Sequence, residues 1–205
     1  RWLQQPFEGG QAAPLVTDAE PAWSAGLALG PKGLVAVGLA GRYVFSVRVG
    51  EVGGASEELY RHEEMVDVGG LSRDGRLLVV HHAEHGDNLH PALRAFELES
   101  MAPVADLWDG EGFGLFVASA GFSPLAGDGR LVVLGDRSGR LRPAIWDPGA
   151  KAVVAGSVVP LGAGTGMDAV LDQHDGLGQL LRPAASEGLL LGDHHERERA
   201  PLAGA

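Results

Sequence analysis

Histidines and acidic residues gather in one short segment of the chain. His81-His82-Ala83-Glu84-His85 has the H-x-x-E-H spacing with which one class of zinc peptidases binds its metal. That chemistry needs both histidines on one face of a helix, with the glutamate beside them as a general base. Here the segment follows the apolar residues 77–80, so it lies at the end of a strand and the start of a loop. On a strand, Glu84 would point away from the face that His81 and His85 share.

We therefore interpret the segment as a polar loop at the rim of a sheet. The residues that we take as a candidate substrate-facing loop are His82, Glu84, His85 and His90. A zinc site at His81, His82 and His85 is kept as a minor alternative that equilibrium dialysis would test. Our expectation is that the chain holds no metal and no other cofactor.

Other motifs of catalytic sites are incomplete. The nucleophile motif G-x-S-x-G does not occur in the sequence: residues 70–74 and 121–125 come nearest, but both lack the second glycine, which the strained turn requires. The glycine-rich residues 162–166 lack the spacing and the following helix of a phosphate-binding loop. We predict no catalytic residues in this chain.

Composition excludes several classes of function. The formal net charge of −11 argues against non-specific nucleic-acid binding, which needs clustered Lys and Arg. The absence of cysteine excludes disulfides and thiolate metal sites. Residues 1–6 contain no apolar signal segment, and Pro160 and several glycines interrupt the long uncharged run at residues 152–167. We expect no membrane partner and take the cytoplasm as the default location.

The elements that must position the histidine segment repeat along the chain. A glycine that precedes a short apolar strand occurs at Gly33, Gly75, Gly129 and Gly188. Further strands follow each of the first three copies. Units of roughly 40–50 residues with four strands are typical of β-propeller blades.

Residues 69–98 define the pattern of one unit. Asp74-Gly75 predicts a two-residue hairpin turn, because glycine accepts a positive φ without a steric clash. Residues 77–80 are apolar throughout, as expected for a strand that is covered on both faces. Helical spacing of apolar residues is nearly absent from the sequence.

We predict an all-β fold, a partial β-propeller of about three to four four-stranded antiparallel blades within residues 1–192. The expected blades are residues 23–63, 65–110 and 113–160, with a fourth of weaker pattern at 161–192. We expect the C-terminal end to be poorly ordered, with a disordered tail at 193–205. A β-sandwich is the alternative architecture.

Residues 69–98, together with Trp108-Asp109-Gly110 and residues 143–148, resemble the N-terminal propeller of prolyl-oligopeptidase-family serine peptidases. The bacterial acylaminoacyl-peptidase or dipeptidyl-peptidase-like branch is the most similar. Residues 5–10 resemble a blade end of that group, and the resemblance covers residues 1–151. In that family the propeller caps an α/β-hydrolase domain that carries the catalytic Ser, Asp and His, and it restricts access to short peptides.

The resemblance implies that this chain is the substrate-gating portion of a larger serine peptidase. Its expected partners are a C-terminal α/β-hydrolase domain and a peptide substrate, and we expect the chain, which begins with Arg1, to be a fragment. No position matches a catalytic residue of the family, so we expect no hydrolysis by the chain alone. The alternative is a non-enzymatic binding propeller that uses an exposed blade face or the rim near residues 81–90, and a downstream G-x-S-x-G motif would separate the two.

Overall fold

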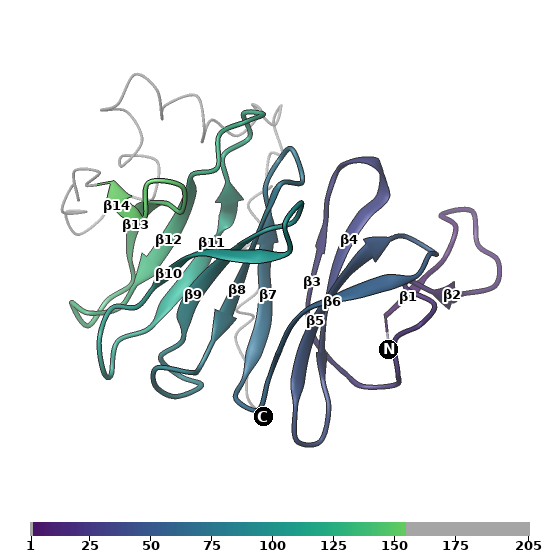
Figure 1. The fold of residues 1–205 in the computed structure, drawn as a ribbon, viewed down its shortest axis with the longest axis horizontal. Coiled ribbons are helices and arrows are strands. Elements are labelled where there is room, and N and C mark those ends of the chain that lie inside the picture. The colour runs from purple at the N-terminus through teal and green to yellow at the C-terminus, as the bar shows by residue number, and fades with distance from the viewer. Residues whose placement is uncertain (1, 155–205) are drawn as a thin grey trace, which may run out of the picture.

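The structure, a computed structural model, describes residues 2–154. Within this range every regular element is a β-strand except the short 3-10 turn η1 (Pro31–Gly33). Three sheets of four antiparallel strands stand side by side, and in each sheet the strands pair in chain order (Figure 1). This arrangement confirms the predicted all-β fold with blade-like sheets. No helix of the described part is long and apolar enough to cross a bilayer.

The three sheets are named blades 1, 2 and 3. Blade 1 consists of β3 (Trp23–Leu29), β4 (Leu34–Ala40), β5 (Phe45–Glu51) and β6 (Ser56–His62). Blade 2 consists of β7 (Val66–Leu71), β8 (Leu77–His82), β9 (Ala92–Glu97) and β10 (Ala102–Leu107). Blade 3 consists of β11 (Leu115–Phe122), β12 (Leu131–Gly135), β13 (Arg142–Asp147) and β14 (Ala152–Val154).

A small hairpin of β1 (Leu3–Gln4) and β2 (Ala13–Pro14) precedes blade 1. The segment after this hairpin packs Leu15, Val16 and Ala19 against β4. The predicted fourth blade at 161–192, the tail at 193–205 and the expected poor order of the C-terminal end lie outside the described residues, as do residues 155–160 of the third predicted range.

The first strands of the blades lie next to one another, with β7 between β3 and β11 (Figure 1). β3 and β7 carry bulges in their pairing with the second strand, between Ser24 and Leu27 and between Val68 and Gly70. The pairing of β11 with β12 has a longer irregularity between Val117 and Phe122. A bulge bends a strand and increases its twist. At the first bulge, a Cβ on Gly26 would lie 2.7 Å from the backbone nitrogen of Val68, so glycine allows β3 to approach β7 closely.

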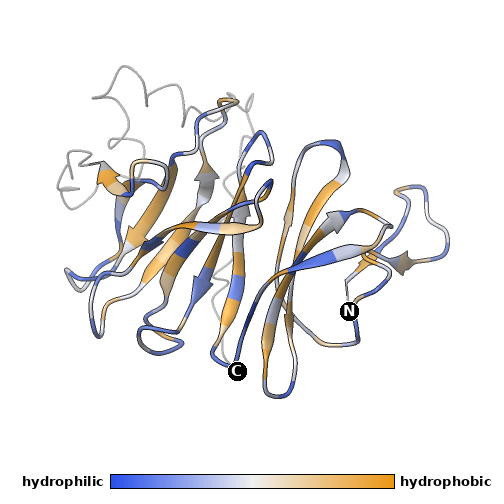
Figure 2. Ribbon diagram, viewed as in Figure 1, coloured by the Kyte–Doolittle hydropathy of each residue, from blue (hydrophilic) through white to orange (hydrophobic). Residues whose placement is uncertain are grey.

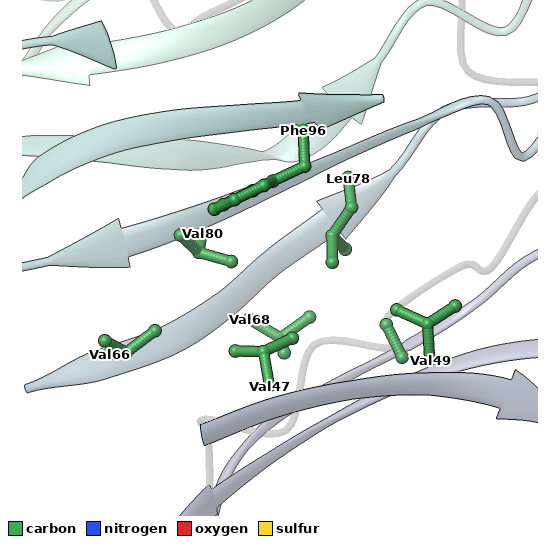
Figure 3. Close-up of a cluster of buried hydrophobic side chains, with 8 residues drawn as sticks. Val47, Val49, Val66, Val68, Leu78, Val80 and Phe96 are labelled. Carbon is green, nitrogen blue, oxygen red and sulfur yellow. The ribbon is translucent and has the colours of Figure 1, made fainter. Parts of the chain in front are cut away.

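The core lies between the blades, and β8 buries side chains on both of its faces. Leu78 and Val80 face blade 1 and belong to one buried cluster with Val47 and Val49 (Figure 3), whereas Val79 packs toward blade 3. The four residues of 77–80 are at most 7% exposed, which confirms the prediction of a doubly covered strand. Figure 2 shows the same pattern, with apolar residues along the strands and polar residues in many of the connecting loops.

The turn between β7 and β8 differs from the predicted two-residue hairpin. The Ser72 N–H donates to the Leu77 carbonyl, so residues 73–76 form the loop. Gly75 has the expected positive φ of 73°, but Asp74 does not share the left-handed region that a two-residue type I′ turn requires. Instead its carboxylate accepts bonds from the Ser72 hydroxyl (2.8 Å) and the Arg76 N–H (3.1 Å), and this favours the longer loop.

Candidate functional site

Two features of the described residues could serve a function, and they lie at opposite ends of blade 2. The first is a hollow of about 840 Å³ between the first strands of the three blades, at the end where β7 turns toward β8. Its lining includes Pro31 of blade 1, Gly70 and Ser72 of blade 2, and Ser119 and Phe122 of blade 3. Ser119 is the exposed serine of this lining, since Ser72 and Ser123 are buried, and the glycines 69–70 add backbone to its wall.

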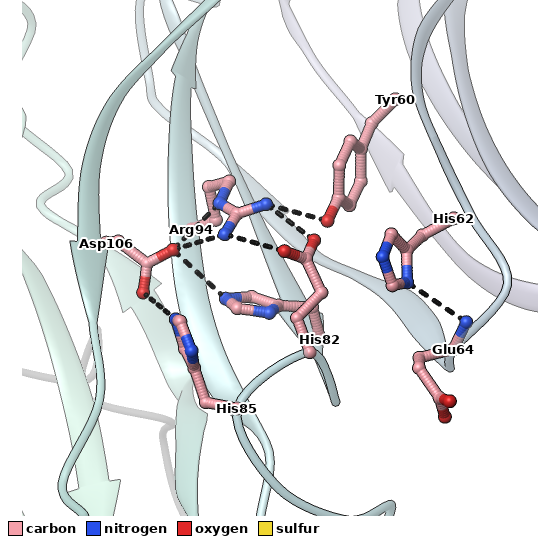
Figure 4. Close-up of polar contacts among 8 residues, drawn as sticks. Tyr60, His62, Glu64, His82, His85, Arg94 and Asp106 are labelled. Atoms are coloured by element: carbon pink, nitrogen blue, oxygen red, sulfur yellow. Dashed lines mark hydrogen bonds and ion pairs between the residues drawn. The ribbon is translucent and has the colours of Figure 1, made fainter.

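The second feature is a cluster of polar side chains at the end of β8, which we call the blade 2 corner (Figure 4). It brings together side chains from β6, β8, β9, β10 and the loop after β8, namely Tyr60, His82, Glu84, His85, Arg94 and Asp106. Register places the strand residues side by side, since Arg94 pairs with Val80 on one side and with Asp106 on the other. The corner therefore depends on strand pairing between residues that are distant in sequence.

His82 is the buried member of the corner. Its side chain is 0% exposed, and its Nε2 lies 3.4 Å from Oδ2 of Asp106. Neither ring nitrogen has a hydrogen-bond partner among the described residues. Buried polar atoms nearly always have such partners, so this imidazole calls for a physical explanation.

Arg94 is the cation at the centre of the corner. Its guanidinium donates to both oxygens of Glu84 (2.6 and 3.2 Å), to Oδ2 of Asp106 (2.8 and 2.6 Å) and to the Tyr60 hydroxyl (2.7 Å). Burial alone would lower the pKa of Arg94, but the bonds to Glu84 and Asp106 raise it. Burial likewise opposes ionisation of Asp106, yet the contacts with His82 and Arg94 hold the pKa of this carboxyl well below its usual range.

His85 returns to the corner because the chain reverses directly after β8. The Gly86 N–H donates to the Ala83 carbonyl, which closes a turn at the strand end. This turn places Nε2 of His85 at 3.2 Å from Oδ1 of Asp106, with the ring packed beside Trp108. The strand ends at His82 and the turn follows, which confirms that the histidine segment lies at the end of a strand and the start of a loop.

His81 points to the other side of β8. Its Nε2 accepts a hydrogen bond from the backbone N–H of Val117 in blade 3 at 3.0 Å. Burial lowers the pKa of His81, which favours the neutral ring that this acceptor role needs. The zinc alternative at His81, His82 and His85 therefore combines side chains from opposite faces.

The sequence-predicted loop is only partly brought together. His82, Glu84 and His85 join the corner, whereas His90 lies farther along the loop, where its ring contacts Asp87 at 3.0 Å. Whether these four residues face a substrate stays a prediction. Sequence reasoning missed Asp106, Tyr60 and Arg94. Arg94 could have been noticed, because a charged residue inside the otherwise apolar strand β9 indicates that an oppositely charged partner lies nearby.

Comparisons with known proteins give limited likeness. No family model and no curated protein matches the chain. Among solved structures, a puromycin-hydrolyzing peptidase of Mycobacterium tuberculosis aligns with 72% of this chain at 23% identity and a TM-score of 0.49. An uncharacterized protein from Listeria monocytogenes aligns with 65% of the chain at 11% identity and a TM-score of 0.46. The chain spans 23% of the first protein and 42% of the second.

Proposed function

We propose that this chain is the β-propeller portion of a serine peptidase of the prolyl oligopeptidase family, and that its blades control which peptides reach a catalytic domain. The observation that carries the proposal is the convergence of β3, β7 and β11 around the hollow of about 840 Å³. The sequence resemblance of residues 1–151 to such propellers supports it, and the acylaminoacyl-peptidase or dipeptidyl-peptidase-like branch is the finer form of the proposal.

The size of the hollow fits a short peptide. Sites that bind small ligands typically measure about 300–1,000 Å³, so a hollow of this volume has room for a few residues of a peptide. The exposed Ser119 and the glycine backbone at residues 69–70 would suit the polar backbone of an extended peptide. Gating by size alone requires no catalytic residue in the propeller.

The proposed partners follow from a propeller that admits peptides and a separate domain that hydrolyses them. A C-terminal α/β-hydrolase domain would supply the serine nucleophile, since G-x-S-x-G is absent here, and a short peptide would be the substrate. The net charge of −11 disfavours nucleic acid as a partner. A cytoplasmic location remains an expectation.

The first test is the reading frame downstream of this segment, followed by activity measurements on the encoded protein. We expect a hydrolase domain with G-x-S-x-G, hydrolysis of short peptidyl substrates by the full protein, and no hydrolysis by residues 1–205 alone. Activity of the isolated chain that a serine-directed inhibitor abolishes would contradict the proposal. A frame that ends without such a domain would leave the non-enzymatic binding propeller as the better hypothesis.

Narrowing the hollow tests the gating itself. A Cβ on Gly70 would meet only Phe122, at 4.0 Å, so G70W extends a ring into the hollow without backbone strain. In the full protein we expect G70W to lower kcat/KM for a pentapeptide by about tenfold more than for a dipeptide, which is about 1.4 kcal/mol of selective hindrance. L141W, at a 56% exposed position of blade 3, is the matched control and should leave the ratio unchanged. Equal effects of G70W on both substrates would overturn the gating role.

A further inference from the structure

We propose that His82, His85 and Asp106 in the blade 2 corner bind a divalent first-row transition metal ion, with zinc as the best fit. Each residue offers one ligand atom, and the three atoms lie within 4.8 Å of one another (Figure 4). Two neutral imidazoles and one carboxylate form a donor set that zinc readily accepts. The site lies at the opposite end of blade 2 from the hollow, so the inference does not depend on the proposed gating function.

The distances suit a tetrahedral ion. Zinc bonds to His nitrogen and to carboxylate oxygen are about 2.0–2.1 Å long, so two ligand atoms of a tetrahedron lie about 3.3 Å apart. Nε2 of His85 lies 3.2 Å from Oδ1 of Asp106, as two ligands of one ion require. Nε2 of His82 lies 3.4 Å from the other oxygen, Oδ2, and the three ligand atoms lie within 4.8 Å of one another. Small side-chain rotations would therefore complete the three-ligand site.

The buried His82 is an independent sign of a ligand. Its ring is 0% exposed, Nδ1 has no hydrogen-bond partner within residues 2–154, and Nε2 has only the 3.4 Å contact with Oδ2 of Asp106. A buried polar group without a partner costs roughly 1–3 kcal/mol in a folded protein. A metal bond to one ring nitrogen would remove this penalty at that atom. It would also explain why a histidine stands at position 82, where an apolar residue could equally fill the buried end of β8.

The charges around the three ligands favour a cation. Glu84 and Asp106 contribute two negative charges and Arg94 one positive charge, so the corner carries a net charge of −1 when the histidines are neutral. Arg94 binds Oδ2 of Asp106 through two donors and leaves Oδ1 directed at His85. Arg94 is therefore a positioning residue that orients the carboxylate, and Glu84 and Tyr60 hold Arg94 in turn.

The site is open to solvent on one side. The side chains of His85 and Asp106 are 38% and 33% exposed, so an ion can enter and a water molecule can take a fourth coordination position. A bound ion would also attach the turn after β8 to the outer strand β10. This assignment replaces the expectation that the chain holds no metal, and it differs from the alternative with His81, which faces blade 3.

Zinc binding by the purified full chain tests the site. To exclude a contribution from the adjacent histidines near the C-terminal end, the measurements use an H194N/H195N background. After treatment with a chelator and dialysis, we expect calorimetric titration with zinc chloride to give one ion per chain, and Co²⁺ to show the visible absorption of a four-coordinate site. H85N and D106N should each weaken zinc binding by at least about tenfold.

Two variants make the result specific. H90N changes a histidine of the same loop that lies outside the corner, and it should bind zinc like the background protein. H82N should abolish binding. If circular dichroism shows that H82N does not fold, the more exposed H85N and D106N decide the question. Absence of zinc binding by the folded background protein, or binding that H85N and D106N leave unchanged, would overturn the proposal.

Discussion

Blade 2 packs between two neighbours, and its two sides end differently. Toward blade 3 the side chains in contact are apolar, with Val79 and Leu93 clustered with Leu131 and Trp146. Backbone N–H groups of Val117 and Leu115 also donate to the His81 ring and to the Pro91 carbonyl. Toward blade 1 the apolar contact gives way to the polar corner around Arg94 (Figures 3 and 4). His81 and His82, adjacent residues of β8, thus lie at the edges of two different interfaces, one with blade 3 and one with blade 1.

The comparison shows how alternation divides roles between neighbouring residues. Successive side chains of a strand point to opposite faces, so His81 and His82 never share an environment. His81 meets a backbone donor and has a structural role, whereas His82 meets a carboxylate and a second histidine. The two adjacent histidines therefore have separate structural roles, one at each interface of blade 2.

The largest expected effect comes from the apolar interface with blade 3. Trp146 is 1% exposed and belongs to the cluster of side chains that joins the two blades. W146A removes a large buried ring and leaves a cavity, so we expect the free energy of unfolding to fall by about 3–5 kcal/mol. Denaturant titration followed by circular dichroism measures the change.

The control for this prediction is a tryptophan on the surface. Trp23 is 82% exposed, so W23A should change the free energy of unfolding by no more than about 0.5 kcal/mol. Similar losses for W146A and W23A would mean that the interface between blades 2 and 3 contributes little to stability.

A smaller effect is expected from the blade 2 corner, whose Arg94 donates to Tyr60 of blade 1 and pairs with Glu84 and Asp106 of blade 2. R94M keeps most of the aliphatic part of the side chain but leaves Glu84 and Asp106 without their shared cation. Breaking a buried ion pair costs about 3–5 kcal/mol, and because the Asp106 side chain is 33% exposed we expect about 2 kcal/mol here. Denaturant titration at neutral pH measures the loss.

The matched control is an ion pair on the surface. Arg61 contacts Glu58 at 3.0 Å, but its side chain is 57% exposed, so R61M should cost less than about 1 kcal/mol. If R94M were no more destabilising than R61M, the ion pairs of the corner would contribute no more to stability than an ordinary surface pair. The two sides of blade 2 would then differ in residue type but not in how ion pairs stabilise them.

The blades were predictable from sequence because their signals are local. A turn glycine such as Gly75 and the apolar residues after it lie within a few positions of each other, and the burial of residues 77–80 follows from their uniform character. The corner was not predictable in the same way. It needs the register of β9 with β10, which sets Arg94 beside Asp106, and the turn at residues 83–86, which brings His85 back to His82.

The smallest expected effect concerns the other end of the blades, where blades 2 and 3 are alike. The turn before β12 resembles the turn at Asp74, because in each the aspartate carboxylate accepts from the backbone N–H two residues later at 3.1 Å. Asp128 also accepts bonds from the Arg130 side chain at 2.8 and 2.7 Å. These bonds lower the pKa of Asp128 to about 2 from the usual 3.8, even though burial opposes the shift.

A lowered pKa in the folded state stabilises the protein at pH values above the unfolded pKa. The contribution of Asp128 is therefore complete above about pH 4 and is lost as the pH falls through about 2. We expect D128N to reduce the free energy of unfolding by about 1–2 kcal/mol at neutral pH and to reduce its decline between pH 4 and 2. D74N should act in the same direction, because the Ser72 hydroxyl lowers the pKa of Asp74. If D128N lowered the free energy of unfolding equally at pH 2 and pH 6, the substitution would act through packing rather than through charge. The two turns would then be alike in structure but not in electrostatics.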